Sequence, residues 1–198
     1  MYGYWKAVPV VFLLLTTVSI ASLEAQDAER MTLVEFTSDA VESWYVVNDG
    51  VMGGRSSSEM RHEEGDIGVF DGNLSLENNG GFASVRAVVA EGALAGASAP
   101  VLRVRGDGKR YQLRLRMGGD FDGVAYAAGF ETTAGQWTTL QLPLKSFRPT
   151  FRGYVPRNAK PLDSAQVRQI GIMLTDKQEG PFRLEIAGLE AVKGRNQG

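Results

Sequence analysis

Residues 101–117 read VLRVRGDGKRYQLRLRM, and apolar side chains alternate with polar ones in both halves of this stretch. The apolar positions that share one face are Leu102 and Val104, followed by Tyr111, Leu113, Leu115 and Met117. A period of two is typical of a β-strand that buries one face. Gly106-Asp107-Gly108 separates the two runs with turn-forming residues, so the stretch predicts a β-hairpin.

The same alternation recurs on both sides of this stretch. Further strands are predicted at residues 82–89, 124–130, 137–144, 170–174 and 182–192. Asp71-Gly72 predicts a hairpin turn within residues 69–76, and Pro143 indicates that its strand ends there or lies at a sheet edge. A helix is expected at residues 163–167, with Asp163 or Ser164 as its N-cap. These elements predict an all-β fold, a two-sheet antiparallel β-sandwich with at most one or two short helices.

Composition excludes several classes of protein. The 198 residues include 21 Lys plus Arg and 23 Asp plus Glu, a net charge of −2, which does not fit a non-specific nucleic-acid binder. Cysteine is absent and His62 is the only histidine, so disulfides, thiolate metal sites and His-rich metal centres are excluded. His62 lies in a charged run at 59–66 that is expected to be a solvated loop. We therefore expect no metal, no cofactor and no nucleic-acid partner.

The N-terminal segment has the pattern of a secretory signal peptide. Lys6 precedes a mostly apolar run at residues 7–20, and small residues lie at Ser19, Ala21 and Ala25. A mitochondrial presequence is disfavoured, because such segments are rich in Arg and this one has none. The predicted organisation is a cleaved signal peptide at 1–25, a polar leader at 26–32, the β-sandwich at 33–192 and a flexible tail at 193–198. The expected location is periplasmic or secreted, and the alternative is a membrane anchor formed by an uncleaved N-terminal segment.

Two loops carry the candidate site residues. Residues 48–55, NDGVMGGR, combine turn residues with Gly53-Gly54, which permits positive φ or close approach of the backbone. This loop is either a rigid connector between strands or a binding loop at the rim of the sandwich. Residues 147–154, FRPTFRGY, mix aromatic and Arg side chains without strand alternation. The predicted ligand- or partner-binding residues are Asn48, Asp49, Gly53, Gly54, Arg55, Arg148, Phe151 and Arg152.

Five arginines lie mostly on the polar side of the 101–117 stretch: Arg103, Arg105, Arg110, Arg114 and Arg116. Like charges on neighbouring strands repel each other, so acidic groups are expected beside them. The chain offers Asp120, Asp122, Glu131 and Glu185 as intramolecular partners. The alternative is an arginine-lined face that binds an anionic partner or a sugar acid through bidentate hydrogen bonds.

Three motifs carry a resemblance to a known family. They are residues 44–58, WYVVNDGVMGGRSSS, residues 72–86, GNLSLENNGGFASVR, and residues 144–149, LKSFRP, with Gly153. Over residues 33–192 the chain resembles the NADH:ubiquinone oxidoreductase complex I intermediate-associated protein 30 family. The resemblance implies a galactose-binding-like β-sandwich of jelly-roll type, related in shape to carbohydrate-binding modules. It also implies the role of the mitochondrial members, which are assembly chaperones for respiratory complex I, and no established catalytic residues.

We therefore expect a non-catalytic domain, exported from the cytoplasm, that binds a protein partner as a chaperone or assembly factor. A carbohydrate-binding module is the alternative, and it requires aromatic side chains exposed on one sheet face beside Asn, Asp or Arg. A hydrolase is the third hypothesis, and it requires a cleft with paired carboxylates.

Overall fold

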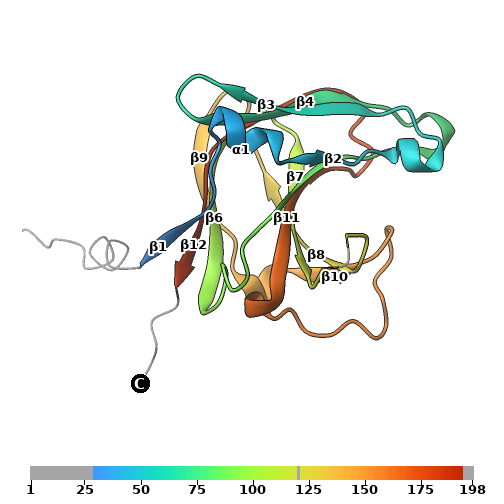
Figure 1. Ribbon diagram of the computed structural model, residues 1–198. Helices are drawn as coiled ribbons and strands as arrows, with labels where there is room; N and C mark the ends of the chain where they lie inside the picture. The colour runs from blue at the N-terminus through green and yellow to red at the C-terminus, as the bar shows by residue number, and fades with distance from the viewer. Residues whose placement is uncertain (1–28, 120, 194–198) are drawn as a thin grey trace, which may run out of the picture.

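The computed structural model describes residues 29–119 and 121–193 of the chain (Figure 1). Its strands form two six-stranded sheets. The first sheet has the order β3-β4-β12-β6-β9, with β1 also paired to β12, and the second has the order β10-β8-β7-β11-β5-β2. Neighbouring strands are antiparallel in both sheets. The predicted all-β, two-sheet antiparallel β-sandwich is confirmed.

The strands of the first sheet are β1 Arg30–Val34, β3 Ser57–Glu63, β4 Ile67–Leu74, β6 Ala97–Arg105, β9 Trp137–Gln141 and β12 Gly180–Lys193. The strands of the second are β2 Tyr45–Val46, β5 Ala83–Val88, β7 Arg110–Met117, β8 Ala125–Glu131, β10 Arg148–Thr150 and β11 Val167–Leu174. β1 and β12 lie side by side in Figure 1. β9 is an edge strand and ends before Pro143, as predicted.

In the part of the chain that the structure describes, helical structure is confined to short connections. The α-helix α1 spans Ser38–Glu42, and single 3₁₀ turns span η2 Asp49–Met52, η3 Glu77–Asn79, η4 Leu144–Ser146 and η5 Ser164–Gln166. η5 replaces the helix predicted at 163–167, and Asp163 caps it by accepting a hydrogen bond from the Ala165 amide. α1 was not predicted; its N-cap is Thr37, whose hydroxyl accepts from the Ala40 amide.

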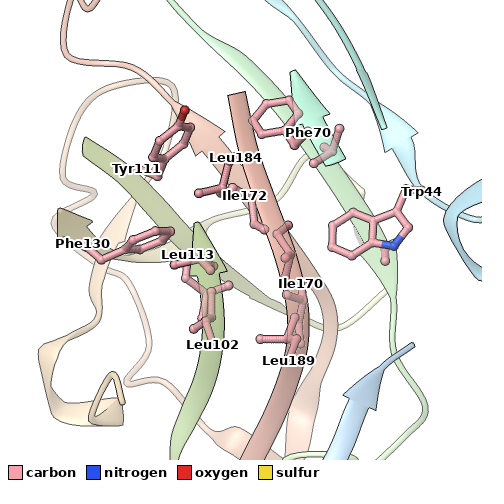
Figure 2. Close-up of a cluster of buried hydrophobic side chains, with 14 of the residues drawn as sticks. Trp44, Phe70, Leu102, Tyr111, Leu113, Phe130, Ile170, Ile172, Leu184 and Leu189 are labelled. Atoms are coloured by element: carbon pink, nitrogen blue, oxygen red, sulfur yellow. The ribbon is translucent and has the colours of Figure 1, made fainter. Parts of the chain in front are cut away.

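The core lies between the two sheets. Figure 2 shows Leu102 and Leu184 from the first sheet facing Leu113 and Ile172 from the second. Of the predicted inward positions, Leu102, Val104, Tyr111, Leu113 and Leu115 are buried in one cluster, and Met117 is partly buried against it. Alternation therefore identified the core-facing side chains correctly, and burial of this apolar surface is the main driving force for folding.

The hairpin predicted at 101–117 is wrong, because its two strands belong to different sheets. β6 pairs with β12 and β9, whereas β7 pairs with β11 and β8. Both sheets face the same core, so the alternation continues unchanged where the chain crosses between them. The Asp107 carboxylate holds this crossover by accepting hydrogen bonds from the Tyr111 hydroxyl at 3.0 Å and the Arg183 amide at 3.0 Å.

The hairpin turn predicted at Asp71-Gly72 is also wrong, because β4 runs straight through both residues. A Cβ on Gly72 would lie 2.0 Å from the Ser57 carbonyl oxygen, so glycine is required here by the close approach of β3. The turn lies instead at residues 64–66, where Gly65 has φ +85°. Most of the charged run at 59–66, including His62, belongs to β3 rather than to a solvated loop.

The predicted signal peptide at 1–25 lies outside the described residues, as does most of the predicted tail. Residues 30–32 of the predicted leader belong to β1. Within residues 29–119 and 121–193, no helix combines the length and the apolar character that crossing a membrane requires.

Candidate functional site

The two predicted loops flank opposite edges of the second sheet. Residues 48–55 follow the edge strand β2, and residues 147–154 contain the other edge strand, β10. In Figure 1, β2 lies at the upper right, β10 lies at the lower right, and β7 and β11 run between them. The structure does not bring the loops into contact, but it places the outward face of the second sheet between them.

Asp49 ties the first loop to the rest of the domain. Its carboxylate is completely buried and accepts hydrogen bonds from the Ser56 amide at 3.0 Å and hydroxyl at 2.6 Å. The same carboxylate accepts from the amides of Gly81 at 2.7 Å and Phe82 at 3.3 Å. Burial raises the pKa of Asp49, but these hydrogen bonds outweigh burial and lower its pKa below the ordinary value. The side chain therefore contacts the protein's own backbone and hydroxyl groups rather than solvent.

Glycines give the Asp49 carboxylate its space. A Cβ on Gly54 would lie 2.4 Å from the Asp49 carboxyl carbon, and one on Gly80 would lie 2.5 Å from its Oδ2. Gly53 ends η2 in the left-handed region with φ +88°, where other residues are strained. Glycine is therefore required at Gly54 to make room for the Asp49 carboxylate and at Gly53 to allow a positive φ.

Asn48 and Arg55 have different surroundings. The Asn48 amide oxygen accepts from the Ser58 hydroxyl at 2.8 Å and the Ser84 amide at 3.2 Å, which joins the loop to β3 and β5. Arg55 is exposed and forms a 3.3 Å ion pair with Glu77. Of the loop's predicted charged residues, Arg55 is therefore the one whose side chain faces solvent.

The second loop presents aromatic and cationic side chains. Phe151 contacts Tyr154 edge to face, with ring centroids 5.6 Å apart, and the Arg152 guanidinium lies 5.3 Å from the Phe151 ring centroid. Arg148 is exposed and donates to the carbonyl oxygens of Lys145 and Phe147. Phe147 itself is buried in the core.

A row of side chains crosses the outward face of the second sheet. Residues paired directly across neighbouring strands point to the same face. From β10 to β2, the paired residues are Arg148, Ala127, Arg114, Gly171, Arg86 and Tyr45. Arg116 lies two residues from Arg114 on β7 and points the same way, while Leu113 and Leu115 point into the core. We call Arg86, Arg114 and Arg116 the arginine cluster.

The arginine cluster is largely buried and short of negative charge. Arg86 and Arg116 are only 8% and 5% exposed. Arg86 donates to the Phe121 carbonyl oxygen at 2.9 Å and to Asp122 at 3.3 Å. Within residues 29–119 and 121–193, no carboxylate forms a salt bridge with Arg114 or Arg116. Burial and repulsion from neighbouring guanidinium groups lower the pKa of Arg114 to about 10 and that of Arg116 to about 9.

Some polar atoms of this face have no hydrogen-bond partner in the described part of the chain. They are Nε of Arg114, Nε of Arg116 and Oε1 of Gln169. A buried donor without an acceptor is unfavourable and rare in folded proteins. The face therefore holds two N–H donors and one amide acceptor that the described residues do not satisfy.

The remaining arginines of the 101–117 stretch either pair with carboxylates or lie on the other sheet. Arg105 pairs with Glu185 and Arg110 pairs with Glu131, two of the predicted intramolecular partners. Because the chain crosses between sheets, Arg103 and Arg105 lie on the outward face of the first sheet, against Trp137. Asp120, another predicted partner, lies outside the described residues.

The described residues contain no group of three His, Asp or Glu side chains able to hold a metal ion. A group of carboxylates lies on the first sheet, where Glu63, Asp71 and Glu185 are paired with Arg61 and Arg183. Carboxylates held in this way are stabilised in the charged form, and the pKa of Glu63 is lowered by its hydrogen bonds from both arginines.

Arg86, Tyr45 and Phe121 were not predicted as parts of this face. Tyr45 and Phe121 are 52% and 39% exposed, and their rings meet edge to face at 5.6 Å. The Arg86 guanidinium lies 5.2 Å from the Phe121 ring centroid. Alternation within residues 82–89 placed Arg86 opposite Val85 and Ala87, but only the strand order shows that it lines up with Arg114.

Comparisons with known proteins identify relatives. The sequence profile described as complex I intermediate-associated protein 30 matches residues 34–186. The chain is 26% identical over 166 residues to "Complex I intermediate-associated protein 30, mitochondrial" of Mus musculus, covering 74% of this chain and 51% of that protein. It is 32% identical over 90 residues to the "probable" protein of the same name in Caenorhabditis elegans, covering 43% of this chain and 26% of that protein. The chain thus spans about half or less of the length of these curated relatives.

The fold resembles that of a carbohydrate-binding module. The family 11 module of the cellulosomal cellulase Lic26A-Cel5E of Clostridium thermocellum superimposes with a TM-score of 0.65 and 15% identity, covering 85% of this chain and 97% of that chain. At this identity, the similarity establishes the β-sandwich architecture alone.

These relatives correct one prediction and confirm another. The periplasmic or secreted location predicted from the N-terminal segment is contradicted, because both relatives are named as mitochondrial. The prediction rested on the apolar run at residues 7–20, and the hydrophobicity of a segment does not by itself determine the compartment to which a protein is sent. The family resemblance is confirmed, because the matched profile covers most of both sheets. The chain therefore belongs to the complex I intermediate-associated protein 30 family.

Proposed function

We propose that this chain is a non-catalytic binding domain that assists respiratory complex I assembly by holding a protein partner. The observation that carries this proposal is the match to the family profile over residues 34–186, from the end of β1 into β12. The feature that this chain shares with the family is therefore the sandwich itself. The names of the mouse and nematode relatives associate that family with complex I intermediates.

The site geometry supports binding rather than bond cleavage. The clustered carboxylates of the first sheet form ion pairs with arginines, so they are not free to act on a substrate. The outward face of the second sheet instead carries buried arginine N–H groups without acceptors. We place the partner on this face, with Arg148 in its row and with Arg55, Phe151 and Arg152 on the flanking loops. Asn48, Asp49, Gly53 and Gly54 contribute by holding the first loop in shape.

Gene deletion in the source cells tests the assembly role. We expect less mature complex I and more of its partly assembled forms on native gels, with recovery when the full chain is expressed again. Affinity purification of the tagged full chain should retrieve complex I subunits after cross-linking. Normal amounts of mature complex I in the deletion strain would rule out the assembly role.

Carbohydrate binding is the second candidate, and one observation favours it. Tyr45 and Phe121 are exposed beside Arg86 on the outward face of the second sheet. Flat aromatic rings next to planar polar groups are suited to sugar recognition. Retardation of the protein in gels containing a neutral or acidic polysaccharide, abolished by Tyr45→Ala, would support this candidate.

A further inference from the structure

The charge of the arginine cluster is not balanced by the described residues. The arginine cluster has three guanidinium groups, and Asp122, whose side chain is 78% exposed, is the described carboxylate that contacts one of them. This local excess of positive charge occurs in a chain whose net charge is −2. The cluster is therefore a specific feature of this face and does not follow from a generally basic surface.

Burying like charges without counterions opposes folding, because each loses hydration and repels its neighbours. Arg116 is 5% exposed, and its Nε has no hydrogen-bond partner in the described part of the chain. Packing alone would be served as well by neutral side chains of similar size. An external anion would supply the missing negative charge to the guanidinium groups of this cluster.

The shape of the row indicates what kind of anion fits. Arg148, Arg114 and Arg86 occupy the first, third and fifth strands of the sheet order. Neighbouring strands lie about 4.8 Å apart, so the row extends over roughly 19 Å. Ala127 and Gly171 separate the arginines and leave little side-chain bulk between them. A line of this length suits an extended chain with several carboxylates better than one compact anion.

We infer that the outward face of the second sheet binds an extended acidic segment of a protein partner, whose Asp and Glu carboxylates pair with Arg86, Arg114 and Arg116. Guanidinium groups bind carboxylates through two parallel hydrogen bonds, which favours Arg over Lys at such a site. The inference rests on the proposed protein-binding function and specifies the chemistry of the partner. Arg148, at the exposed edge of the row, extends the same surface.

Titration of the full chain with a fluorescent oligoglutamate peptide tests this inference. We expect binding that weakens as salt is added, and no comparable binding of oligoglutamine. Arg114→Gln and Arg116→Gln should each weaken oligoglutamate binding by roughly tenfold or more, the loss expected for a charge-assisted hydrogen bond. Arg114→Lys should recover only part of the affinity, because it keeps the charge but not the planar fork.

Arg103→Gln is the matched control, because Arg103 is exposed on the outward face of the other sheet. It removes the same charge and should leave oligoglutamate affinity within roughly twofold of wild type. Thermal melts establish that each variant is folded before its affinity is compared. Equal weakening by Arg103→Gln and Arg114→Gln would overturn the inference, because it would indicate attraction to net charge alone.

Competition distinguishes the acidic peptide from other anions. Inorganic phosphate and oligogalacturonate should displace oligoglutamate only weakly; tighter binding of either would overturn the assignment to a peptide. This titration uses purified protein, so its result is independent of the gene-deletion experiment. Retained oligoglutamate binding together with normal complex I would reject the assembly role alone, whereas a complex I defect without oligoglutamate binding would reject the acidic partner alone.

Discussion

At the scale of single residues, Asp49 makes a prediction about stability. Asp49→Asn keeps the size of the side chain but replaces one acceptor oxygen with an N–H₂ group that faces the donors of Ser56, Gly81 or Phe82. Because the site is completely buried, we expect a loss of about 2–4 kcal/mol in the free energy of unfolding. Urea denaturation followed by circular dichroism measures this loss.

Arg55→Ala is the control in the same loop. Its ion pair with Glu77 is exposed on both sides, so the change should cost at most about 0.5 kcal/mol. Comparable losses for both variants would show that the loop is stabilised by its surface charges and not by the Asp49 carboxylate.

Arg116 makes the opposite prediction, in which a substitution raises stability. Arg116→Met removes a buried like charge while retaining an unbranched side chain that can pack, so stability should increase by about 1 kcal/mol. For a chain of this size, that gain corresponds to roughly 2–4 °C in Tm. An unchanged or lower Tm would mean that Arg116 is well satisfied in the folded protein.

The effect of Arg116 also depends on pH. Its folded-state pKa is lowered to about 9, so below that pH the side chain is charged both folded and unfolded, and the full destabilisation is present. Above about pH 9 the folded chain releases the proton before the unfolded chain does, and the destabilisation declines. The Tm gap between wild type and Arg116→Met should therefore narrow between neutral pH and about pH 10; a gap that widened would contradict this assignment of the charge.

At the scale of elements, Gly72 and Gly65 test where the β3–β4 hairpin turns. A Cβ on Gly72 would collide with the Ser57 carbonyl oxygen. A Cβ on Gly65 would meet no neighbouring atom, so a substitution there is unfavourable only because φ is +85°. We expect Gly72→Ala to cost more than about 2 kcal/mol and Gly65→Ala about 1 kcal/mol. Equal costs, measured by thermal and urea denaturation, would contradict the strand pairing described here.

These two glycines show what could be predicted from the sequence and what could not. Alternation identified the buried faces of β6 and β7, because side-chain direction is a property of each strand by itself. It could not identify strand partners, because both sheets bury side chains in one core and the pattern looks the same on either side of residues 106–108. Asp71-Gly72 was predicted to be a turn. At Gly72, however, the absence of a side chain allows β4 to lie close to the backbone of β3.

The candidate site was predictable in part for the same reason. The glycine-rich loop after β2 is visible in the sequence because turn chemistry is local. The row from Arg148 through Arg114 to Arg86 joins residues from three distant segments and depends on strand order and register. Neither of these is encoded in a local pattern.

At the scale of the whole molecule, the first sheet is built around β12, and the β6–β7 crossover and the shared core join it to the second sheet. β12 pairs with β1, β4 and β6 over 14 residues, so one strand organises most of the first sheet. Asp107 connects the crossover from β6 to β7 with the backbone of β12 at Arg183. The core side chains of both sheets form a single cluster, so the apolar face of each sheet is buried only while it packs against the other sheet.

A cavity in either sheet should therefore weaken both sheets together. Leu102 lies on β6 of the first sheet and Leu113 on β7 of the second, and both are fully buried (Figure 2). We expect Leu102→Ala and Leu113→Ala each to cost about 2–5 kcal/mol, whereas Val88→Ala, at an exposed position on β5, should cost about 0.5 kcal/mol or less. Far-UV circular dichroism and tryptophan fluorescence should report one midpoint in each variant, because the sheets share their core. Two separate midpoints in Leu113→Ala would show that the first sheet stays folded without the second, in which case the arginine face could open without unfolding the domain.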